Sequence, residues 1–237
     1  MSSLFNTVLY QPLFNLLVFL YEKLAFNDLG VAIILLTLII RVILYPLFYK
    51  SFKNQTLLQK IQPDIQKIQH DHKNDREKQA QALLALYQQH KVNPFTSFLL
   101  VLVQLPILIV IYQLILKGFS PEAFQNLYSF ISVPEEINNT LLGLIDLSKR
   151  SIVVVGLAAV LQYFQGKLSL PANSVKISRQ MVFIGPVLTL IILTSLPAAV
   201  GLYWAATSGF SIIQQIIINK RIAKENGEYK TNNSKTP

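Results

Sequence analysis

A single arginine inside an apolar run constrains this chain more than any other feature. Arg41 lies in the segment Leu29–Tyr49, with twelve uncharged residues before it and eight after it. At about 1.5 Å per helical residue, it would lie roughly 13 Å from the charged end at Lys50, in a hydrocarbon core about 30 Å thick. A guanidinium at that depth costs about 3 kcal/mol on insertion scales. Arg41 must therefore face a polar or hydrated cavity, or else snorkel to the surface.

The composition places the chain among integral membrane proteins. Hydrophobic residues make up 52% of its 237 residues and charged residues only 14%, whereas soluble domains carry about 25% charged residues. The chain has no cysteine, which excludes disulfides and thiolate metal sites. Walker A, H-E-x-x-H and G-x-S-x-G motifs are also absent. We therefore expect no nucleotide hydrolysis, no metal, no cofactor and no enzymatic activity.

Charge-poor segments predict an all-α fold with five transmembrane helices. The expected spans are 29–49, 93–116, 151–170, 180–195 and 198–219. The third reaches spanning length if Lys167 snorkels at its end. The last two come from one uncharged run of 40 residues, which is about 60 Å of helix and too long for one crossing. Ser195-Leu196-Pro197 divides that run, because proline interrupts helical hydrogen bonding.

The uncharged N-terminal stretch Leu4–Tyr21 predicts an amphipathic helix. Its apolar residues recur at helical spacing: Phe5, Val8, Leu9, Pro12, Leu13, Leu16, Leu17 and Leu20. Polar residues such as Asn6 and Asn15 interrupt it. We therefore expect residues 1–27 to form a helix that lies in the membrane interface. A signal peptide and a sixth span are the alternatives that the residues leave open.

The uneven distribution of basic residues fixes the expected orientation. Segments 50–92, 167–179 and 220–237 carry 16 Lys and Arg residues, whereas segments 1–28 and 117–150 carry four. Because basic residues collect on the cytoplasmic side, we expect the N-terminus outside and the C-terminus in the cytoplasm. The net charge of +9 is then mainly a topology signal, and we expect no DNA partner. The basic tail 220–237 should be cytoplasmic and disordered beyond its first turns.

Residues 50–92 are the sizeable hydrophilic element of the chain. Apolar residues share one helical face in each half of it: Leu57, Leu58, Ile61, Ile65 and Ile68, then Leu83, Leu84 and Tyr87. The polar stretch His70–Asp75 between the halves predicts a bend. A plain connector needs only about 2–8 residues. We therefore expect an amphipathic helical hairpin at the membrane surface that docks or binds something.

The expected spans contain polar side chains but no acidic ones. These polar residues are Gln104, Gln113, Gln162, Gln165, Thr189, Thr194, Tyr203, Trp204, Thr207, Ser208, Ser211, Gln214 and Gln215. Such groups need partners in hydrocarbon, so each is either an interhelical contact or part of a cavity lining. Trp204 could also be an interfacial anchor. With no carboxylate in the spans, Arg41 cannot form a buried salt bridge within them.

Three stretches resemble the YidC/Oxa/Alb family of membrane protein insertases. They are GVAIILLTLIIRVILYP at 30–46, LYQQHKVNP at 86–94 with QLPILIVIY at 104–112, and GLYWAATSGFSIIQQ at 201–215. The resemblance extends from about residue 10 to residue 219. It departs from the family pattern after Asn93-Pro94 and at Ser208, where the family often has asparagine.

The resemblance implies a fold, a site and a function. Residues 28–219 would be a five-span insertase core around a hydrophilic groove, with the hairpin 50–92 capturing clients. Arg41 matches the groove arginine, and by position Gln104, Gln162, Gln165, Trp204 and Ser208 are candidates for the lining. The chain would insert and help fold nascent membrane proteins in the bacterial inner (plasma) membrane without nucleotide hydrolysis.

The partners that the resemblance implies are nascent membrane proteins as clients and the lipid bilayer; the Sec translocon and the ribosome are further candidates. A different class of function stays open from the residues, namely a transporter or channel that uses Arg41 for an anionic solute. The sequence shows no inverted repeat or coupling carboxylate that transport would need.

Overall fold

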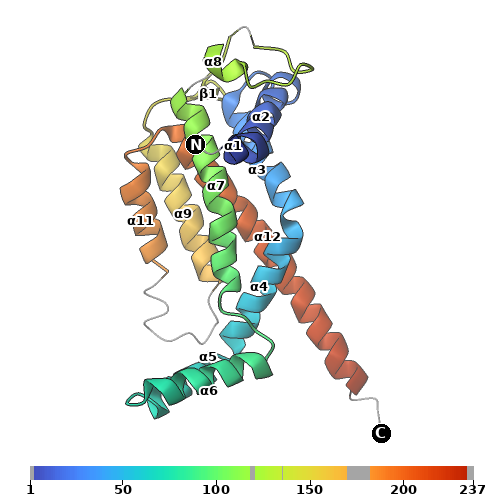
Figure 1. Ribbon diagram of the computed structural model, residues 1–237, viewed down its shortest axis with the longest axis vertical. Coiled ribbons are helices and arrows are strands. Elements are labelled where there is room, and N and C mark those ends of the chain that lie inside the picture. Colours follow the sequence, from blue (N-terminus) through green and yellow to red (C-terminus); the bar gives the residue numbers. More distant parts are fainter. Residues whose placement is uncertain (1–2, 118–120, 135, 170–181, 234–237) are drawn as a thin grey trace.

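Five helices form the bundle of the computed structural model, which describes residues 3–117, 121–134, 136–169 and 182–233. They are α3 (Leu29–Ile43), α7 (Thr96–Lys117), α9 (Ile152–Leu168), α11 (Ile184–Leu193) and α12 (Ala198–Asn233). Helix α12 packs along both α9 and α3, and α11 packs on α9 (Figure 1). Each helix overlaps one of the five expected spans. The mostly helical fold is therefore confirmed.

The expected first span is broken near its end. Helix α3 ends at Ile43, and α4 (Tyr45–Lys60) continues at an angle of 69° to it. Pro46 explains the break, because proline offers no N–H to the preceding turn and its ring clashes with that turn. Leu44 joins the two helices with φ −85° and ψ 4°. The bend directs α4 out of the bundle. Most of α4 belongs to the segment 50–92, which we expected to form the hairpin.

The break expected at Ser195-Leu196-Pro197 lies between α11 and α12, as predicted. Helix α12 then continues to Asn233, well beyond the expected end of the last span at 219. The tail was expected to be ordered only in its first turns, and the helix continues as far as Asn233. Its Lys, Arg, Glu and Ala residues favour helix, and no proline interrupts them. Parts of the expected spans, at 170 and 180–181, lie outside the described residues.

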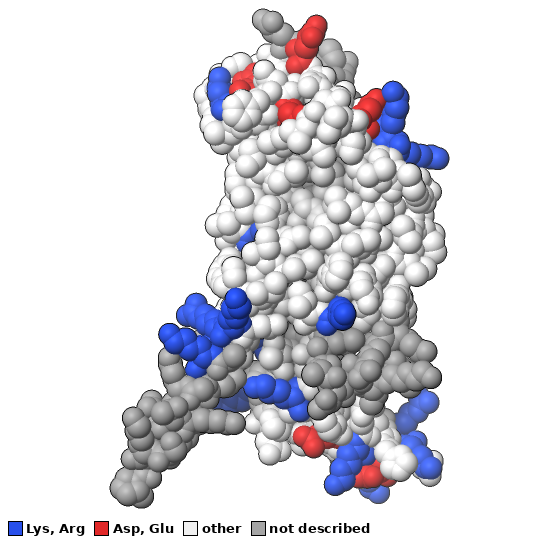
Figure 2. All heavy atoms as spheres, turned by 180° about the vertical axis from the view of Figure 1, so that it is seen from behind, with Lys and Arg blue, Asp and Glu red and all other residues white. Residues whose placement is uncertain are grey.

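Within the described residues, no helix alone has both the length and the hydropathy of a full crossing, and the bent pair α3–α4 has them together. The outer surface of the bundle is nevertheless apolar. Leu157 on α9, Ile191 on α11 and Ile217 on α12 are all more than half exposed. On the face in Figure 2, charged side chains gather mostly at the two ends, and the band between them is uncharged apart from a small patch of basic atoms at its edge. Large exposed apolar surfaces of this kind mark contact with another apolar phase.

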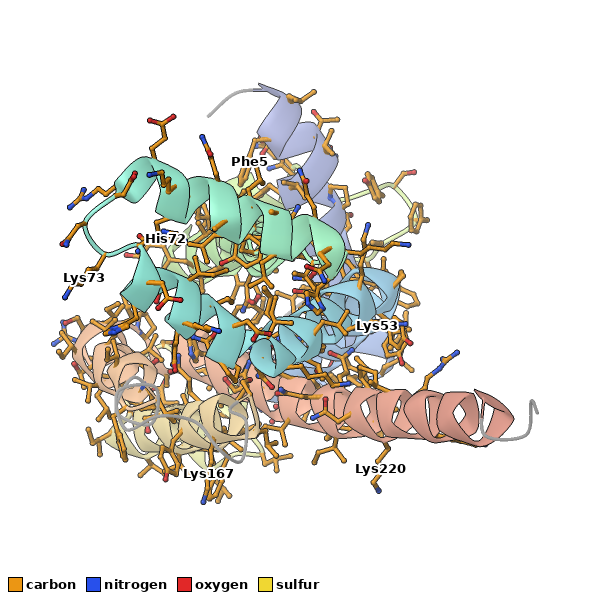
Figure 3. The ribbon with its side chains drawn as sticks, turned by 90° about the horizontal axis from the view of Figure 1, so that it is seen from below. Phe5, Lys53, His72, Lys73, Lys167 and Lys220 are labelled. Atoms are coloured by element: carbon orange, nitrogen blue, oxygen red, sulfur yellow. The ribbon has the colours of Figure 1, made fainter. Side chains whose placement is uncertain are left out.

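The N-terminal stretch is helical throughout, as α1 (Ser3–Phe5), a π-helical turn η1 (Asn6–Tyr10) and α2 (Gln11–Lys23). It lies across the long axis of the bundle (Figures 1 and 3). Phe14, Leu17 and Tyr21 are buried, whereas Leu4 and Val8 are exposed. Because both sides of this helix are apolar, the buried face is only partly the one that periodicity predicted. Its place in a membrane interface stays a prediction.

Asn15 holds the N-terminal helix to the loop that follows α7. Its side-chain amide donates to the carbonyl oxygens of Gln11 and Asn126 at 2.7 and 2.9 Å, and its oxygen accepts from the Tyr128 N–H at 2.6 Å. Asn15 is 1% exposed. All of its hydrogen-bonding groups are therefore used, which explains a buried asparagine in an apolar helix.

A short β-hairpin closes the same end of the bundle, after the single-turn helix α8 (Pro121–Phe124). Strands β1 (Thr140–Leu141) and β2 (Ile145–Asp146) pair antiparallel. The expected all-α fold did not include these strands. Asp28 ties them to α3, because its carboxylate accepts from the N–H groups of Val31 and Leu142. The N-cap of α3 is thus also an anchor for the hairpin.

The amphipathic hairpin at the other end is formed by α5 (Gln62–Asp71) and α6 (Arg76–Gln89). Asp75 begins α6 by accepting from the Lys78 N–H at 3.0 Å. Ile61, Ile65 and Val92 form its buried core. The hairpin lies beneath the bundle, with its turn at His72 and Lys73 directed outward (Figure 3). The bend is where the sequence predicted it, but Leu84 is 58% exposed and does not join this core.

We expect Gly30→Ala to destabilise the fold, because a Cβ at this position would lie 2.5–2.9 Å from atoms of Leu141. Overpacking of this kind costs about 1–3 kcal/mol, so thermal unfolding of the purified protein in detergent should shift down by several degrees. Gly156→Ala is the matched control, because nothing lies within 4 Å of its Cβ position. Equal unfolding temperatures for the two variants would contradict the close packing of the β-hairpin on α3.

Candidate functional site

Arg41 lies in the last turn of α3 and is turned into the bundle. Its side chain is buried, with only 5% of the residue exposed. Nη1 donates to the side-chain oxygen of Gln214 at 3.2 Å, and Nη2 donates to the carbonyl oxygen of Thr207 at 3.0 Å. Both partners belong to α12. The snorkelling alternative for Arg41 is therefore wrong in this fold.

Two further contacts complete the surroundings of Arg41. The Gln214 side-chain nitrogen donates back to the carbonyl oxygen of Arg41 at 3.2 Å, so these two residues form a reciprocal pair. The ring of Phe48, on α4, lies under the guanidinium with its centroid 4.2 Å from Cζ. A cation over an aromatic face is stabilised by the ring quadrupole. The bend at Leu44 makes this contact possible, because it redirects α4.

None of these partners carries a negative charge. Lys23–Glu22, Lys78–Asp75 and Lys149–Asp146 are ion pairs among the described residues, and none of these three involves Arg41. At Lys149–Asp146 the hydrogen bond between the two side chains lowers the pKa of Asp146 and raises that of Lys149. Arg41 instead keeps an uncompensated positive charge among neutral acceptors. Such a group is costly to bury, which is typical of functional sites in membrane segments.

A small cavity adjoins the guanidinium between α3, α7 and α12. Its volume is about 20 Å³, which is room for about one water molecule. The lining residues are Thr37, Ile40, Arg41, Leu44, Phe48, Val103, Gln104, Ile107, Tyr203 and Thr207. Tyr203, Thr207 and Gln104 all line the cavity, and the Thr207 hydroxyl is buried without a hydrogen-bond partner among the described residues. Polar groups from three helices therefore converge beside Arg41.

The structure brings together only some of the six residues that the sequence suggested for the site. Arg41 and Gln104 line the cavity. Gln162 instead accepts from the Thr189 hydroxyl, which joins α9 to α11. Trp204 packs against the apolar cluster around Val155 and Leu193.

The remaining two candidates also lie apart from the cavity lining. Ser208 is 3% exposed and is buried on α12. Gln165 is on α9, where its carbonyl oxygen accepts from the N–H and the hydroxyl of Ser169. We retain these residues as proposed lining of a more open groove.

Four residues next to Arg41 were not singled out as site residues: Phe48, Tyr203, Thr207 and Gln214. Three of them had a usable signal, because positions 203, 207 and 214 fall on one face of a helix. Phe48 had no such signal. Its contact depends on the angle of the bend, which local sequence does not specify.

Comparison with known proteins gives one consistent family. The model of the 60Kd inner membrane protein family matches residues 19–225. The chain belongs to this family. It is 31% identical over 221 residues to the membrane protein insertase YidC of Geobacter metallireducens, and 32% identical over 216 residues to that of Geobacter sulfurreducens. Each match covers 91% of this chain and 38% of the relative, so the chain spans about two fifths of the length of these relatives.

A solved structure supports the same family at the level of the fold. The chain is similar to the crystal structure of an active YidC insertase with its first transmembrane domain resolved. The TM-score is 0.62 at 27% sequence identity, and the match covers 88% of this chain and 46% of that one. The resemblance to YidC/Oxa/Alb insertases is therefore confirmed. Family membership places the chain in the inner membrane.

We expect Arg41→Met to leave the unfolding temperature in detergent unchanged or to raise it. Methionine fills a similar volume, and replacing an unneutralised buried charge by an apolar group is often neutral or stabilising. The backbone carbonyl that accepts from Gln214 is retained in this variant. A fall as large as that of Gly30→Ala would show that Arg41 mainly holds α3 to α12, and would argue against a functional cation.

Proposed function

We propose that this chain is a membrane protein insertase that moves polar segments of client proteins into and across the inner membrane. The observation that carries the proposal is the buried, uncompensated charge of Arg41 in an otherwise uncharged band. Its relatives are named membrane protein insertases, which agrees with this interpretation.

The proposed mechanism is electrostatic attraction along a shortened apolar path. A client tail must carry carboxylates and peptide groups through hydrocarbon, where each unsatisfied group is costly. A hydrated groove beside Arg41 would reduce the thickness of hydrocarbon that the tail has to cross. The attraction of Arg41 for a carboxylate at 4 Å rises from about 1 kcal/mol in water to about 4 kcal/mol at an effective dielectric constant of 20. The apolar span of the client then partitions into lipid, and its burial drives the step.

The remaining features are assigned within this proposal. Gln104 lines the groove beside Arg41, and Gln162, Gln165, Trp204 and Ser208 line its open form. The bundle crosses the membrane with five spans, the N-terminus outside and the C-terminus in the cytoplasm, because the α4–α6 end carries the larger share of basic residues. The hairpin α5–α6 meets clients first. No nucleotide is used.

The alternative function, transport of an anionic solute, lacks a supporting observation among the described residues. A hairpin of two amphipathic helices also has no role in solute transport. We therefore do not pursue this alternative.

Insertion into proteoliposomes tests the proposal. A single-span client with an acidic tail should insert when this protein is present, and Arg41→Met should lower the rate about tenfold or more, because a hydrogen bond to a charged group contributes about 1.5–3 kcal/mol. Arg41→Lys should fall between the two, because lysine keeps the charge but loses the planar fork of donors.

Two controls make the result specific. Gly156→Ala, on the outer side of α9, should insert the client at the wild-type rate. A client whose tail carboxylates are replaced by amides should lose most of its dependence on Arg41. Insertion no faster than in empty liposomes, with the protein shown to be folded, would contradict the proposed function.

A further inference from the structure

The geometry points to Gln214 as an internal ligand of Arg41 that a client carboxylate displaces, an inference that rests on the proposed function. In the structure the side-chain oxygen of Gln214 accepts a hydrogen bond from Nη1 of the guanidinium. An incoming acidic group would bind at this same nitrogen. Gln214 therefore holds the site closed between clients. Only a group that binds Arg41 more tightly than the Gln214 amide can then open the site.

The closed state depends on a carbonyl that the helix break leaves free. Arg41 lies in the last turn of α3, where backbone carbonyls lack the usual partner four residues later. Gln214 fills this vacancy by donating to the Arg41 carbonyl while it accepts from the Arg41 side chain. One amide thus satisfies two groups of the same residue. The helix break at Pro46 leaves the Arg41 carbonyl free, and Gln214 is the residue that binds it.

Of the hydrogen-bonded ligands of Arg41, Gln214 is the one that can leave. The Thr207 ligand is a backbone carbonyl of α12, which is fixed by the helix. The Gln214 ligand is the end of a flexible side chain with three rotatable bonds. Along α12, position 214 is also about 10 Å from Thr207 in the direction of the basic end. A client arriving from that end reaches Gln214 before it reaches the cavity.

Exchange of ligands at Arg41 favours anions. A neutral amide or carbonyl that replaces Gln214 makes a hydrogen bond of the same kind and gains little. The hydrogen bond from the guanidinium is charge-assisted with either ligand, and a carboxylate adds the attraction between two opposite full charges, which is stronger in a buried site than in water. The carboxylate also neutralises a buried cation that has no carboxylate partner within the described residues. Gln214 thereby makes Arg41 selective for acidic client segments.

Two opposite substitutions test this role. Gln214→Glu supplies a permanent carboxylate beside Arg41, so insertion of an acidic-tailed client should fall about tenfold or more. Gln214→Leu removes the competing ligand, so insertion of the same client should rise above the wild-type rate. Effects of opposite sign are the expected result. A loss of activity in both variants, or in neither, would overturn the assignment.

A matched control lies at the next residue of α12. Gln215 hydrogen-bonds to Ser169 and not to Arg41, so Gln215→Glu should not reproduce the block caused by Gln214→Glu. An equal block by both variants would show a general effect of charge on α12 and would overturn the inference.

A second readout needs no client and separates this inference from the proposed function. Gln214→Glu should raise the unfolding temperature in detergent, because it pairs the buried cation, and this increase should vanish in the Arg41→Met background. Such a double-mutant cycle isolates the interaction between positions 41 and 214. An increase that persists without Arg41, or no increase at all, would contradict the pairing. Failure of insertion by the wild-type protein would instead contradict only the proposed function.

Discussion

The interaction on which this structure depends is the burial of one guanidinium among neutral acceptors. Arg41 is held by a backbone carbonyl, a side-chain amide and an aromatic ring, and two of these three ligands come from α12. An arginine paired with a carboxylate would be neutralised, and it would attract the acidic groups of a client only weakly. An arginine held by neutral groups keeps most of its attraction for anions. The rest of the bundle can be understood as the framework that keeps Arg41 in this state.

The two ends of the bundle differ in how firmly they are held. At the end near the N-terminal helix, Asp28, Asn15 and Tyr21 all hydrogen-bond across to the loop before α9. That loop also caps α12, because the carbonyl oxygens of Lys149 and Leu147 accept from its first two N–H groups. At the other end, α4 leaves the bundle and packs on α12 mainly through apolar side chains. This asymmetry suits a site that is closed on one side and opens on the other.

The sequence allowed much of this to be predicted, and the reasons for the failures are physical. Local composition can be read from a single sequence, and it was sufficient to predict the buried Arg41, the five helical segments and the break at Ser195-Leu196-Pro197. The angle at Leu44 is set by packing of α4 on α12, so the contact of Phe48 with Arg41 had no local signal.

The choice among polar residues in the last helix was also beyond composition. Tyr203, Thr207 and Gln214 share a face with each other but not with Trp204, and helical spacing indicates this. Which face meets α3 is decided by tertiary packing. Tertiary packing also explains Gln162, which was expected to line the groove with Arg41. It bonds instead to Thr189 on the neighbouring helix.

The central claim is that client carboxylates pass beside Arg41, and disulfide crosslinking tests it most directly. The chain contains no cysteine, so one can be placed at Val103 in the cavity lining and another at Leu157 on the exposed face of α9. A client with a cysteine next to its acidic tail residues should crosslink to Val103→Cys during insertion and not to Leu157→Cys. The crosslink should disappear when the tail carboxylates are replaced by amides. Equal crosslinking at both positions, or crosslinking that ignores the tail charge, would contradict the account.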